Sequence, residues 1–580
     1  MSELRGAVAP TSGAQDDAEF DEAIFDEVVS EVAAHAVGWS RTSPKERAAL
    51  LAQVVEDTAA VAREWSVAAC AAKGYDLESP EGAEEVFSGV TTFVRMAQAL
   101  RHSMLDLERY GRPRYRGPVR HKPDSRIAVQ VMPANVFDRL FYSGVTAEVW
   151  MEPGVTESQV QDGQAPAHRS PAEHAGVSLV LGAGNVASLG PRDVLSKLFA
   201  DGKVVVLKAN PVNEYLVPYW QRAMRALIEP GYLRIVTGGA RAGRYLTAHE
   251  LISDVHVTGS DKTYDAIVFG VGEEGARRKR ENDPLVTKPV SGELGNVSPV
   301  VIVPGEWTAK EIRYQAEHVA TMMANNAGFN CLTPRVIVTW SKWAQREEFF
   351  SALGEVLSSL PTRRAYYPGA LERRAAFLTS HADVEEWGEG AEGATPWTLV
   401  RNVDASNVED MAFNVEAFCA LTAETTLEAA SPADFIGRAT AFCNDVVWGT
   451  LSMTLLCDPR SLSDLETGPA IEEAIANLRY GSIGVNIWHA LSFALATPTW
   501  GAYPGHARND IQSGCGVVGN AYLFDRAQKS VVRGPFVARP VPAWFATNLH
   551  ANDVATRVLD FEVQPSWLKV PGLVRAALKA

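Results

Sequence analysis

The six cysteines of the chain are the first candidates for chemistry, because a thiolate is a strong nucleophile near neutral pH. They are scattered, with no CxxC pair: Cys70, Cys331, Cys419, Cys443, Cys457 and Cys515. This spacing speaks against a zinc ribbon or a disulfide framework and fits a reducing cytosol. Cys331 stands apart, because it lies in the small-residue loop NNAGFNCLTPR before the apolar run VIVTW. Cys443 and Cys457 fit buried small apolar residues better.

Two glycine motifs could each indicate a dinucleotide site, GAGNVA at 182–187 and GVGEEG at 270–275. That fingerprint also requires an acidic residue about 20 positions on, to hold the ribose 2′-hydroxyl. The strand after the first motif ends in LKAN (207–210), without a carboxylate, and the basic run RRKR (277–280) follows the second. We therefore interpret these glycines as tight-turn residues. The basic run fits a solvated helix end or loop, with a local anion contact as the alternative.

The elements that position these residues alternate between strand and helix from residue 175 onward. GVSLVLG, KVVVLKA, LRIVTGG and DVHVTGS are predicted strands separated by helical segments, and a second α/β run follows over about 298–479. This order predicts an α/β fold with a parallel sheet and crossover helices. Upstream, residues 21–110 predict helices, one of which begins at Ser43-Pro44 with an N-cap and a first-turn proline. The polar segment 156–174 predicts a surface loop.

Six motifs occur in one order along the chain: AGNVASLGP, VVVLKANP, HVTGS, GELGNVSP, NNAGFNCLTPR and VEAF. Together they resemble the aldehyde dehydrogenase superfamily over roughly 175–520, and more loosely over the helical region before it. The resemblance implies a cofactor-binding domain with an open parallel sheet, an α/β catalytic domain and a small β oligomerisation arm. It also implies NAD(P) as cofactor and a small-molecule aldehyde as substrate.

We expect the domains in this order: a mobile tail at 1–20, the cofactor domain at 21–292, the catalytic domain at 293–480, and a return to the cofactor domain at 481–580. Residues 116–152 and a strand near 527–540 are the candidates for the arm. Members of the family usually exchange strands between subunits, which implies a homodimer or a homotetramer. The C-terminal extension, which includes WLKVPGLVRAALKA, is expected to dock on the body or on a partner subunit.

The resemblance assigns catalytic roles to three residues. Cys331 would attack the aldehyde to form a thiohemiacetal and, after hydride transfer, a thioester. The Asn185 amide and the backbone N–H of Cys331 would hold the oxyanion. Glu293 would activate the water that hydrolyses the thioester. Taken alone, Asn185 and Glu293 could equally be a turn residue and a strand-end carboxylate.

On the cofactor side, the resemblance places Lys208 at the adenosine ribose and Gly238 in the adjoining loop. Gly259 and Ser260 would start a helix whose N-terminus faces the pyrophosphate.

Glu416 would hold the nicotinamide ribose, with Phe418 packing beside it. NAD-preferring members often carry Glu three residues after the cofactor lysine, where this chain has Pro211. Because no carboxylate there would repel a 2′-phosphate, Pro211 favours NADP over NAD.

Three features depart from the family pattern. Phe329 stands where Gln is expected, which affects the shape of the substrate throat. The segment from Gly259 to Glu293 is longer than usual, and we expect the insertion to include GVGEEGARRKREN. The second glycine usual after HVTGS is absent, so the phosphate helix is expected to start differently.

Composition narrows the classes of partner. The net charge of −16 over 580 residues disfavours nucleic acids and anionic membranes. The twelve histidines show no HExxH, so we predict no metal site. No run of 18 apolar residues and no N-terminal apolar region occur, which indicates a cytoplasmic protein without a membrane span or signal peptide.

The segment 480–503 (YGSIGVNIWHALSFALATPTWGAY) is expected to line the substrate entrance, and it indicates an apolar or aromatic aldehyde. Two other functions stay open. An acyl-CoA or acyl-carrier reductase is one, although branches that use coenzyme A tend to lack the Glu at position 293. A non-catalytic cofactor-binding protein on the same fold is the other.

Overall fold

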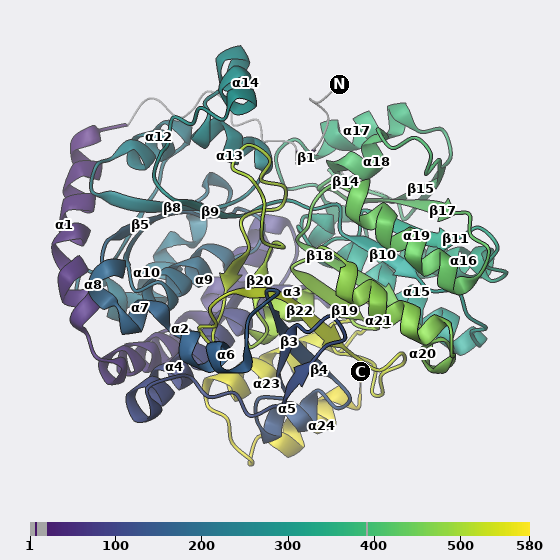
Figure 1. Cartoon of the computed structure of the whole chain (residues 1–580), viewed down its shortest axis with the longest axis horizontal. Coiled ribbons are helices and arrows are strands. Elements are labelled where there is room, and N and C mark those ends of the chain that lie inside the picture. Colours follow the sequence, from purple (N-terminus) through teal and green to yellow (C-terminus); the bar gives the residue numbers. More distant parts are fainter. Residues whose placement is uncertain (1–5, 8–19, 390–392, 580) are drawn as a thin grey trace.

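The structure is a computed structural model that describes residues 6–7, 20–389 and 393–579. Its two largest sheets have five and eleven strands. In Figure 1 the five-stranded sheet lies on the left among teal and blue helices, and the larger sheet lies on the right. The predicted α/β class is confirmed.

The five-stranded sheet is parallel throughout, in the order β7-β6-β5-β8-β9. Its strands are β5 (Val177–Leu181), β6 (Val204–Lys208), β7 (Leu233–Val236), β8 (Ile252–Thr258) and β9 (Val290–Glu293). The apolar run VVVLK of β6 is buried at every position, as expected of a parallel strand covered on both faces. The strand order changes direction between β5 and β8, and open α/β sheets bind ligands at such a point.

The crossover helices that flank this sheet include α9 (Leu189–Leu195), α10 (Val217–Ala223), α12 (Ala240–Ala248) and α13 (Asp261–Val268). Upstream lie α1 (Glu22–Arg41), α2 (Pro44–Lys73), α3 (Gly82–Glu84), the π-helical turn η2 (Glu85–Thr91) and α4 (Thr92–Tyr110). The predicted start of α2 is confirmed, because Ser43 caps it in a reciprocal capping box with Glu46.

The larger sheet has a core of parallel strands, which lie between residues 299 and 485. Its core strands are β10 (Pro299–Ile302), β11 (Val336–Trp340), β15 (Trp397–Val403), β17 (Leu421–Leu427), β18 (Ser452–Leu456) and β19 (Ser482–Val485). The helices packed on it include α15 (Ala309–Ala324), α16 (Arg346–Ser359), α19 (Pro432–Asp445) and α21 (Thr467–Asn477). An edge strand, β13 (Val384–Trp387), pairs antiparallel with β15.

The strands of the predicted arm are present, and they extend this sheet within the same chain. They are β2 (Val119–His121), β3 (Ile127–Met132), β4 (Thr146–Met151) and β22 (Ala527–Arg533). β22 lies between β19, to which it is parallel, and β4, to which it is antiparallel. The catalytic sheet is therefore completed by the chain's own arm, whereas the resemblance implies exchange with another subunit.

The C-terminal segment docks on the body, one of the two predicted alternatives. Its helices are α23 (Ala551–Val563) and α24 (Val570–Ala577), drawn in yellow beside α5 (Val136–Phe141) at the bottom of Figure 1. The ring of Phe561 lies 5.0 Å from those of both Phe137 and Phe141. Arg95 of α4 donates to Asp138 of α5 at 2.8 Å and also pairs with Glu562 of α23. This ion-pair triad and the aromatic cluster hold the arm's connecting helix against the C-terminal segment.

Some predicted loops contain helices. Residues 156–174 form α6 (Glu157–Gly163), α7 (Pro166–Arg169) and α8 (Pro171–His174) instead of a plain surface loop. α6 starts with a capping box between Thr156 and Gln159, and α7 and α8 each start with proline. The insertion near 270–283 is α14 (Gly272–Glu281), on which Arg277 pairs with Glu274 and Glu281. Its basic run thus lies on a solvated, ion-paired helix.

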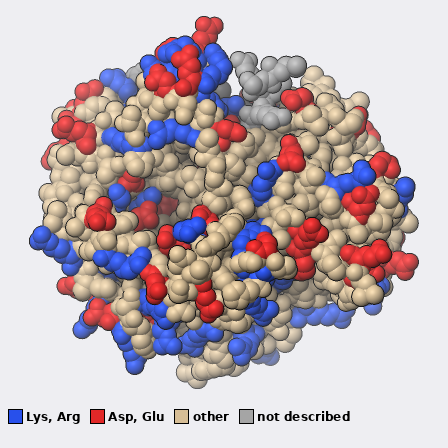
Figure 2. All heavy atoms as spheres, viewed as in Figure 1, with Lys and Arg blue, Asp and Glu red and all other residues tan. Residues whose placement is uncertain are grey.

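Most of the predicted N-terminal tail, 1–5 and 8–19, lies outside the described residues. Gly6–Ala7 form β1, which pairs with β16 (Val415–Glu416) and so departs from a wholly mobile tail. On the face seen in Figure 2, Lys and Arg side chains are interspersed with Asp and Glu. Among the described residues, no helix has the length and apolar character needed to cross a membrane, and no cluster of His, Cys, Asp and Glu could hold a metal ion.

Candidate active site

Five of the predicted site residues lie at one edge of the five-stranded sheet. Asn185 follows β5, Lys208 ends β6, Gly238 follows β7, Gly259 follows β8 and Glu293 ends β9. Because the strands are parallel, their carboxyl ends meet at the same edge. The parallel topology thus brings together residues that are up to about a hundred positions apart in the sequence.

Cys331 reaches this edge from the larger sheet. It lies between the turn η5 (Asn325–Gly328) and β11, and its thiol donates a hydrogen bond to Glu293 Oε1 at 3.4 Å. Ser298 Oγ donates to the Cys331 carbonyl at 2.8 Å and fixes the backbone of the loop. Of the predicted site residues, Cys331 and Glu293 are thus brought into direct contact.

Burial controls the protonation of this pair. Glu293 is 2% exposed, and burial, followed by the nearby carboxylate of Asp193, raises the pKa of Glu293 to about 7. Burial, and then the carboxylates of Glu293 and Glu416, raise the pKa of the Cys331 thiol well above its usual value. The resting pair is therefore a thiol beside a carboxyl group that changes charge near neutral pH.

Asn185 holds its amide against the nucleophile loop. Its Nδ2 donates to the carbonyl oxygen of Phe329, two residues before Cys331, at 2.9 Å. A side-chain amide has two N–H groups, so the group that bonds Phe329 has a second hydrogen to donate. Asn185 is 6% exposed, which restricts its reorientation.

A buried polar network that sequence reasoning missed holds Asn185 in place. Lys73, the last residue of α2, donates to Glu85 at 2.5 Å, to the Asn185 carbonyl at 3.2 Å and to Asn326 Oδ1 at 2.9 Å. The Tyr366 hydroxyl shares its single O–H between the same two oxygens of Asn185 and Asn326, each at 3.0 Å. The only local signal was a lysine before Gly74, which is typical of an ordinary helix C-terminus.

Asn326 connects this network to the nucleophile loop. Its Nδ2 donates to the carbonyl oxygens of Asn185 and Phe329 at 3.0 and 3.1 Å and to Asn330 Oδ1 at 3.0 Å. Its φ of 52° and that of Ala327 (55°) are left-handed, a conformation that asparagine tolerates better than most residues. The tight turn before the nucleophile thus depends on Asn326.

Phe329, which replaces the expected Gln, faces other aromatic rings. Its ring centroid lies 4.8 Å from Tyr366 and 5.9 Å from both Tyr367 and Phe418. With 1% exposure, the ring is part of the core below the loop. Phe329 therefore stabilises the loop by packing against these rings in the core.

The residues at Glu416 fit a nicotinamide ribose. Glu416 Oε1 is buried and has no hydrogen-bond partner among the described residues, so a ligand hydroxyl could satisfy it. Burial raises the pKa of Glu416 to about 7. Phe418, two residues on, has a φ of 42°, and Arg373 donates to its carbonyl at 3.0 Å. The Phe418 ring packs with Phe329 and Tyr367, so it supports the Glu416 turn.

The residues predicted for the adenosine and pyrophosphate side lie at the same edge of the sheet. Ser260 caps α13 by accepting from the N–H of Thr263 at 3.1 Å, so the helix starts directly at Asp261 without a second glycine. A Cβ added at Gly259 would meet no atom within 4 Å, which leaves the backbone there open to close approach. Lys208 Nζ lies 3.2 Å from the carbonyl oxygen of Ala209.

Glu214 is a second residue that the sequence interpretation missed. Pro211 starts the 3-10 helix η4 (Pro211–Leu216), which turns Glu214 back toward β7. Glu214 Oε1 accepts from the N–H of Gly238 at 2.9 Å. A carboxylate therefore does lie between the ends of β6 and β7, although the position three residues after Lys208 has none.

The comparisons with known proteins concern the family and the fold. The sequence model of the aldehyde dehydrogenase family matches residues 147–392. No curated protein matches the chain. Among solved structures, the aldehyde dehydrogenase KauB from Pseudomonas aeruginosa is similar with a TM-score of 0.61 and 17% identity, over 91% of this chain and 92% of the other.

Two further structures are similar in fold. Aldehyde dehydrogenase C from Pseudomonas syringae, a mutant solved with NAD+ and octanal, has a TM-score of 0.60 and 16% identity over 92% of this chain and 97% of its own. An indole-3-acetaldehyde dehydrogenase solved with NAD+ has a TM-score of 0.59 and 19% identity, over 91% and 92% of the two chains. The family model over residues 147–392 supports the resemblance predicted from the six motifs, and the solved structures show that the chain has the aldehyde dehydrogenase fold.

Proposed function

We propose that the chain oxidises an aldehyde to the free carboxylic acid with NAD(P)+, with Cys331 as nucleophile and Glu293 as general base. The observation that carries the proposal is the 3.4 Å hydrogen bond from the half-buried Cys331 thiol to the buried Glu293 carboxylate. A nucleophile within reach of a base of pKa about 7 has the arrangement that proton transfer at neutral pH requires.

The reaction begins when Glu293 accepts the thiol proton and the Cys331 sulfur bonds to the aldehyde carbon. The carbonyl oxygen gains the electron pair of the C=O bond as an alkoxide. The Cys331 backbone N–H and the second N–H of Asn185 then donate to that oxygen. NAD(P)+, when bound, supplies the acceptor for the hydride that leaves this carbon. The carbon becomes the acyl carbon of a thioester with Cys331.

Hydrolysis completes the cycle at the same two residues. Glu293 first releases the proton of the thiol to solvent, and its carboxylate then removes a proton from water. The resulting hydroxide bonds to the acyl carbon, and the C–S bond breaks. The sulfur regains a proton as the carboxylic acid leaves. Since Glu293 serves as base in both halves, its presence supports hydrolysis over transfer of the acyl group to coenzyme A.

For the cofactor, Glu416 would hold the nicotinamide ribose, the N-terminus of α13 the pyrophosphate and Lys208 the adenosine ribose. Pro211 favours NADP, but Glu214 supports the opposite preference. A carboxylate at the Lys208 edge accepts hydrogen bonds from ribose hydroxyls and repels a 2′-phosphate. We therefore propose NAD+ as the preferred form.

The test is to follow reduced nicotinamide formation by the purified chain over an aldehyde panel, with NAD+ and NADP+ in parallel and with and without coenzyme A. We expect turnover without coenzyme A and a carboxylic acid as product. Strict dependence on coenzyme A, with an acyl-CoA product, would overturn the hydrolytic assignment.

A further inference from the structure

A large cavity lies between the nucleophile loop and the C-terminal segment. Its volume is about 480 Å³, and at one end it is lined by Val186, Asn330, Leu332 and Phe493. Asn330 and Leu332 flank Cys331, and the Cys331 side chain packs in one apolar cluster with Leu332 and Phe493. Cys331 itself does not line the cavity, which therefore ends beside it, at Asn330 and Leu332.

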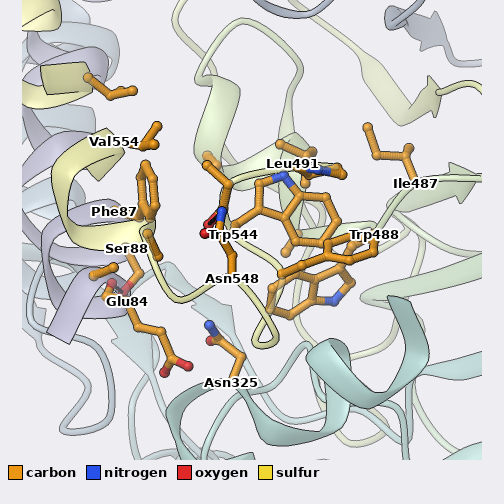
Figure 3. Close-up of a pocket in the computed structure, with 18 of the residues that line it drawn as sticks. Glu84, Phe87, Ser88, Asn325, Ile487, Trp488, Leu491, Trp544, Asn548 and Val554 are labelled. Atoms are coloured by element: carbon orange, nitrogen blue, oxygen red, sulfur yellow. Dashed lines mark hydrogen bonds between the residues drawn. The ribbon is translucent and has the colours of Figure 1, made fainter. Parts of the chain in front are cut away.

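Most residues of the cavity walls come from three parts of the chain, and others come from residues 140–145 and 314–332. One wall is η2 and α4 with Phe87, and a second is the segment before α22 (Ala490–Leu495) with Trp488. The third is the C-terminal segment 535–577, which contributes its loop with Trp544 and both its helices. Figure 3 shows Phe87 and Val554 on one side and Trp488 with Leu491 on the other, with Trp544 between them.

The chemistry of these walls is apolar and aromatic. The indole rings of Trp544 and Trp488 lie 6.0 Å apart. Two of the three lining arginines are neutralised by their neighbours, since Arg363 pairs with Glu84 at 2.9 Å and Arg95 with Glu562, and Arg539 is the third. Apolar surroundings with aromatic faces favour a ligand that carries rings.

The volume of the cavity limits the size of the ligand that it can hold. An engineered apolar cavity of about 150 Å³ in another protein holds one benzene molecule. The present volume of about 480 Å³ has room for about three such rings.

We propose that this cavity is the substrate channel, that the C-terminal segment forms its outer wall, and that the preferred substrate is an aldehyde on a bulky, ring-bearing apolar body. The inference rests on the proposed function, since it places the aldehyde group at Cys331. Trp544 is the specificity-determining residue contributed by the C-terminal segment. The segment thus has a role in substrate selection besides its docking on α5.

The test compares kcat/KM for 2-naphthaldehyde with that for propanal. Trp544→Ala removes an aromatic wall, and Val554→Phe fills the space beside Phe87. Each is expected to lower the ratio of the two kcat/KM values by roughly tenfold, because the larger substrate loses contact or space. The matched control is Trp567→Ala, which removes a tryptophan of the same segment that is 59% exposed and does not line the cavity.

A binding measurement separates this inference from the proposed function. Calorimetric titration with 2-naphthylmethanol, an unreactive analogue, is expected to show binding to the wild type and at least tenfold weaker binding to Val554→Phe. The inference is overturned if neither variant changes the ratio of the two kcat/KM values and the alcohol binds the wild type and Val554→Phe equally well. That result leaves the proposed function standing. If the alcohol binds the wild type and binds Val554→Phe at least tenfold more weakly, but the protein turns over no aldehyde, only the proposed function is overturned.

Discussion

The Cys331 thiol and the Glu293 carboxylate meet at 3.4 Å although they belong to different sheets. Glu293 ends a strand of the five-stranded sheet, and Cys331 precedes a strand of the eleven-stranded one. Their distance is therefore set by how the two sheets dock. Weaker packing at that junction would separate nucleophile and base and lower activity before either sheet unfolds.

Replacing the nucleophile should abolish catalysis. Cys331→Ala is expected to lose about 10³-fold or more in kcat, because no other group can form the thioester. Steady-state rates with an aldehyde check this, and intrinsic fluorescence titration should show that NAD(P)+ still binds. Cys515→Ser, at an exposed cysteine, is the control, and an equal loss in that variant would contradict a special role for Cys331.

Replacing the base should slow the first half of the reaction and block the second. Glu293→Gln is expected to release at most one equivalent of reduced nicotinamide per chain and then stop, because the thioester is not hydrolysed. Rapid-mixing absorbance measures this burst. In the wild type, steady-state turnover limited by hydrolysis should rise with pH through about 7, since only the ionised carboxylate of Glu293 accepts a proton. A flat profile between pH 6 and 8 would contradict this assignment.

The buried network should act through Asn185. Tyr366→Phe removes the hydrogen bond that the hydroxyl shares between the Asn185 carbonyl and Asn326 Oδ1, worth about 1 kcal/mol. We expect kcat to fall roughly tenfold with little change in KM, because the oxyanion donor is displaced and substrate binding is not. Tyr367→Phe is the matched control. A change confined to KM would speak for a role in substrate binding.

The cofactor preference should depend on Glu214. Glu214→Gln keeps the size of the side chain and removes its charge, so kcat/KM for NADP+ is expected to rise about tenfold relative to that for NAD+. Parallel kinetics with the two cofactors measure the ratio. A wild-type enzyme that already prefers NADP+ would favour the interpretation drawn from Pro211.

The arm should remain within its own chain. Because β22 joins β4 to β19 of the same chain, no second subunit is needed to complete the catalytic sheet. We expect multi-angle light scattering to give the mass of one chain, 62.8 kDa. Twice that mass at every concentration tested would indicate the strand exchange that the family resemblance implies.

Much of the cofactor-binding fold could be predicted, because its signals are local. The buried apolar runs of β5 and β6 and the cap at Ser43 each depend on a few adjacent residues. The residues of the candidate site could be predicted where a local sequence motif identifies them, as for Cys331 and Glu293.

The rest depends on contacts between distant segments. Lys73 donates a hydrogen bond to Asn326, which lies 253 positions away in the sequence, and no motif near either residue indicates that contact. Glu214 approaches Gly238 only because η4 turns the chain after β6. The short helices at 157–174 escaped prediction because their polar composition is also typical of a loop.

The position of β22 has a consequence for synthesis. The strand lies at residues 527–533 and pairs with both β4, near residue 150, and β19, near residue 480. The ribosome therefore makes β22 after both of the strands that it joins. The sheet can close only after more than nine-tenths of the chain has left the ribosome. Until then β4 and β19 have exposed hydrogen-bonding edges, which are open to pairing with other chains. Nascent chains stalled before β22 are thus the most exposed to aggregation and the most in need of a chaperone.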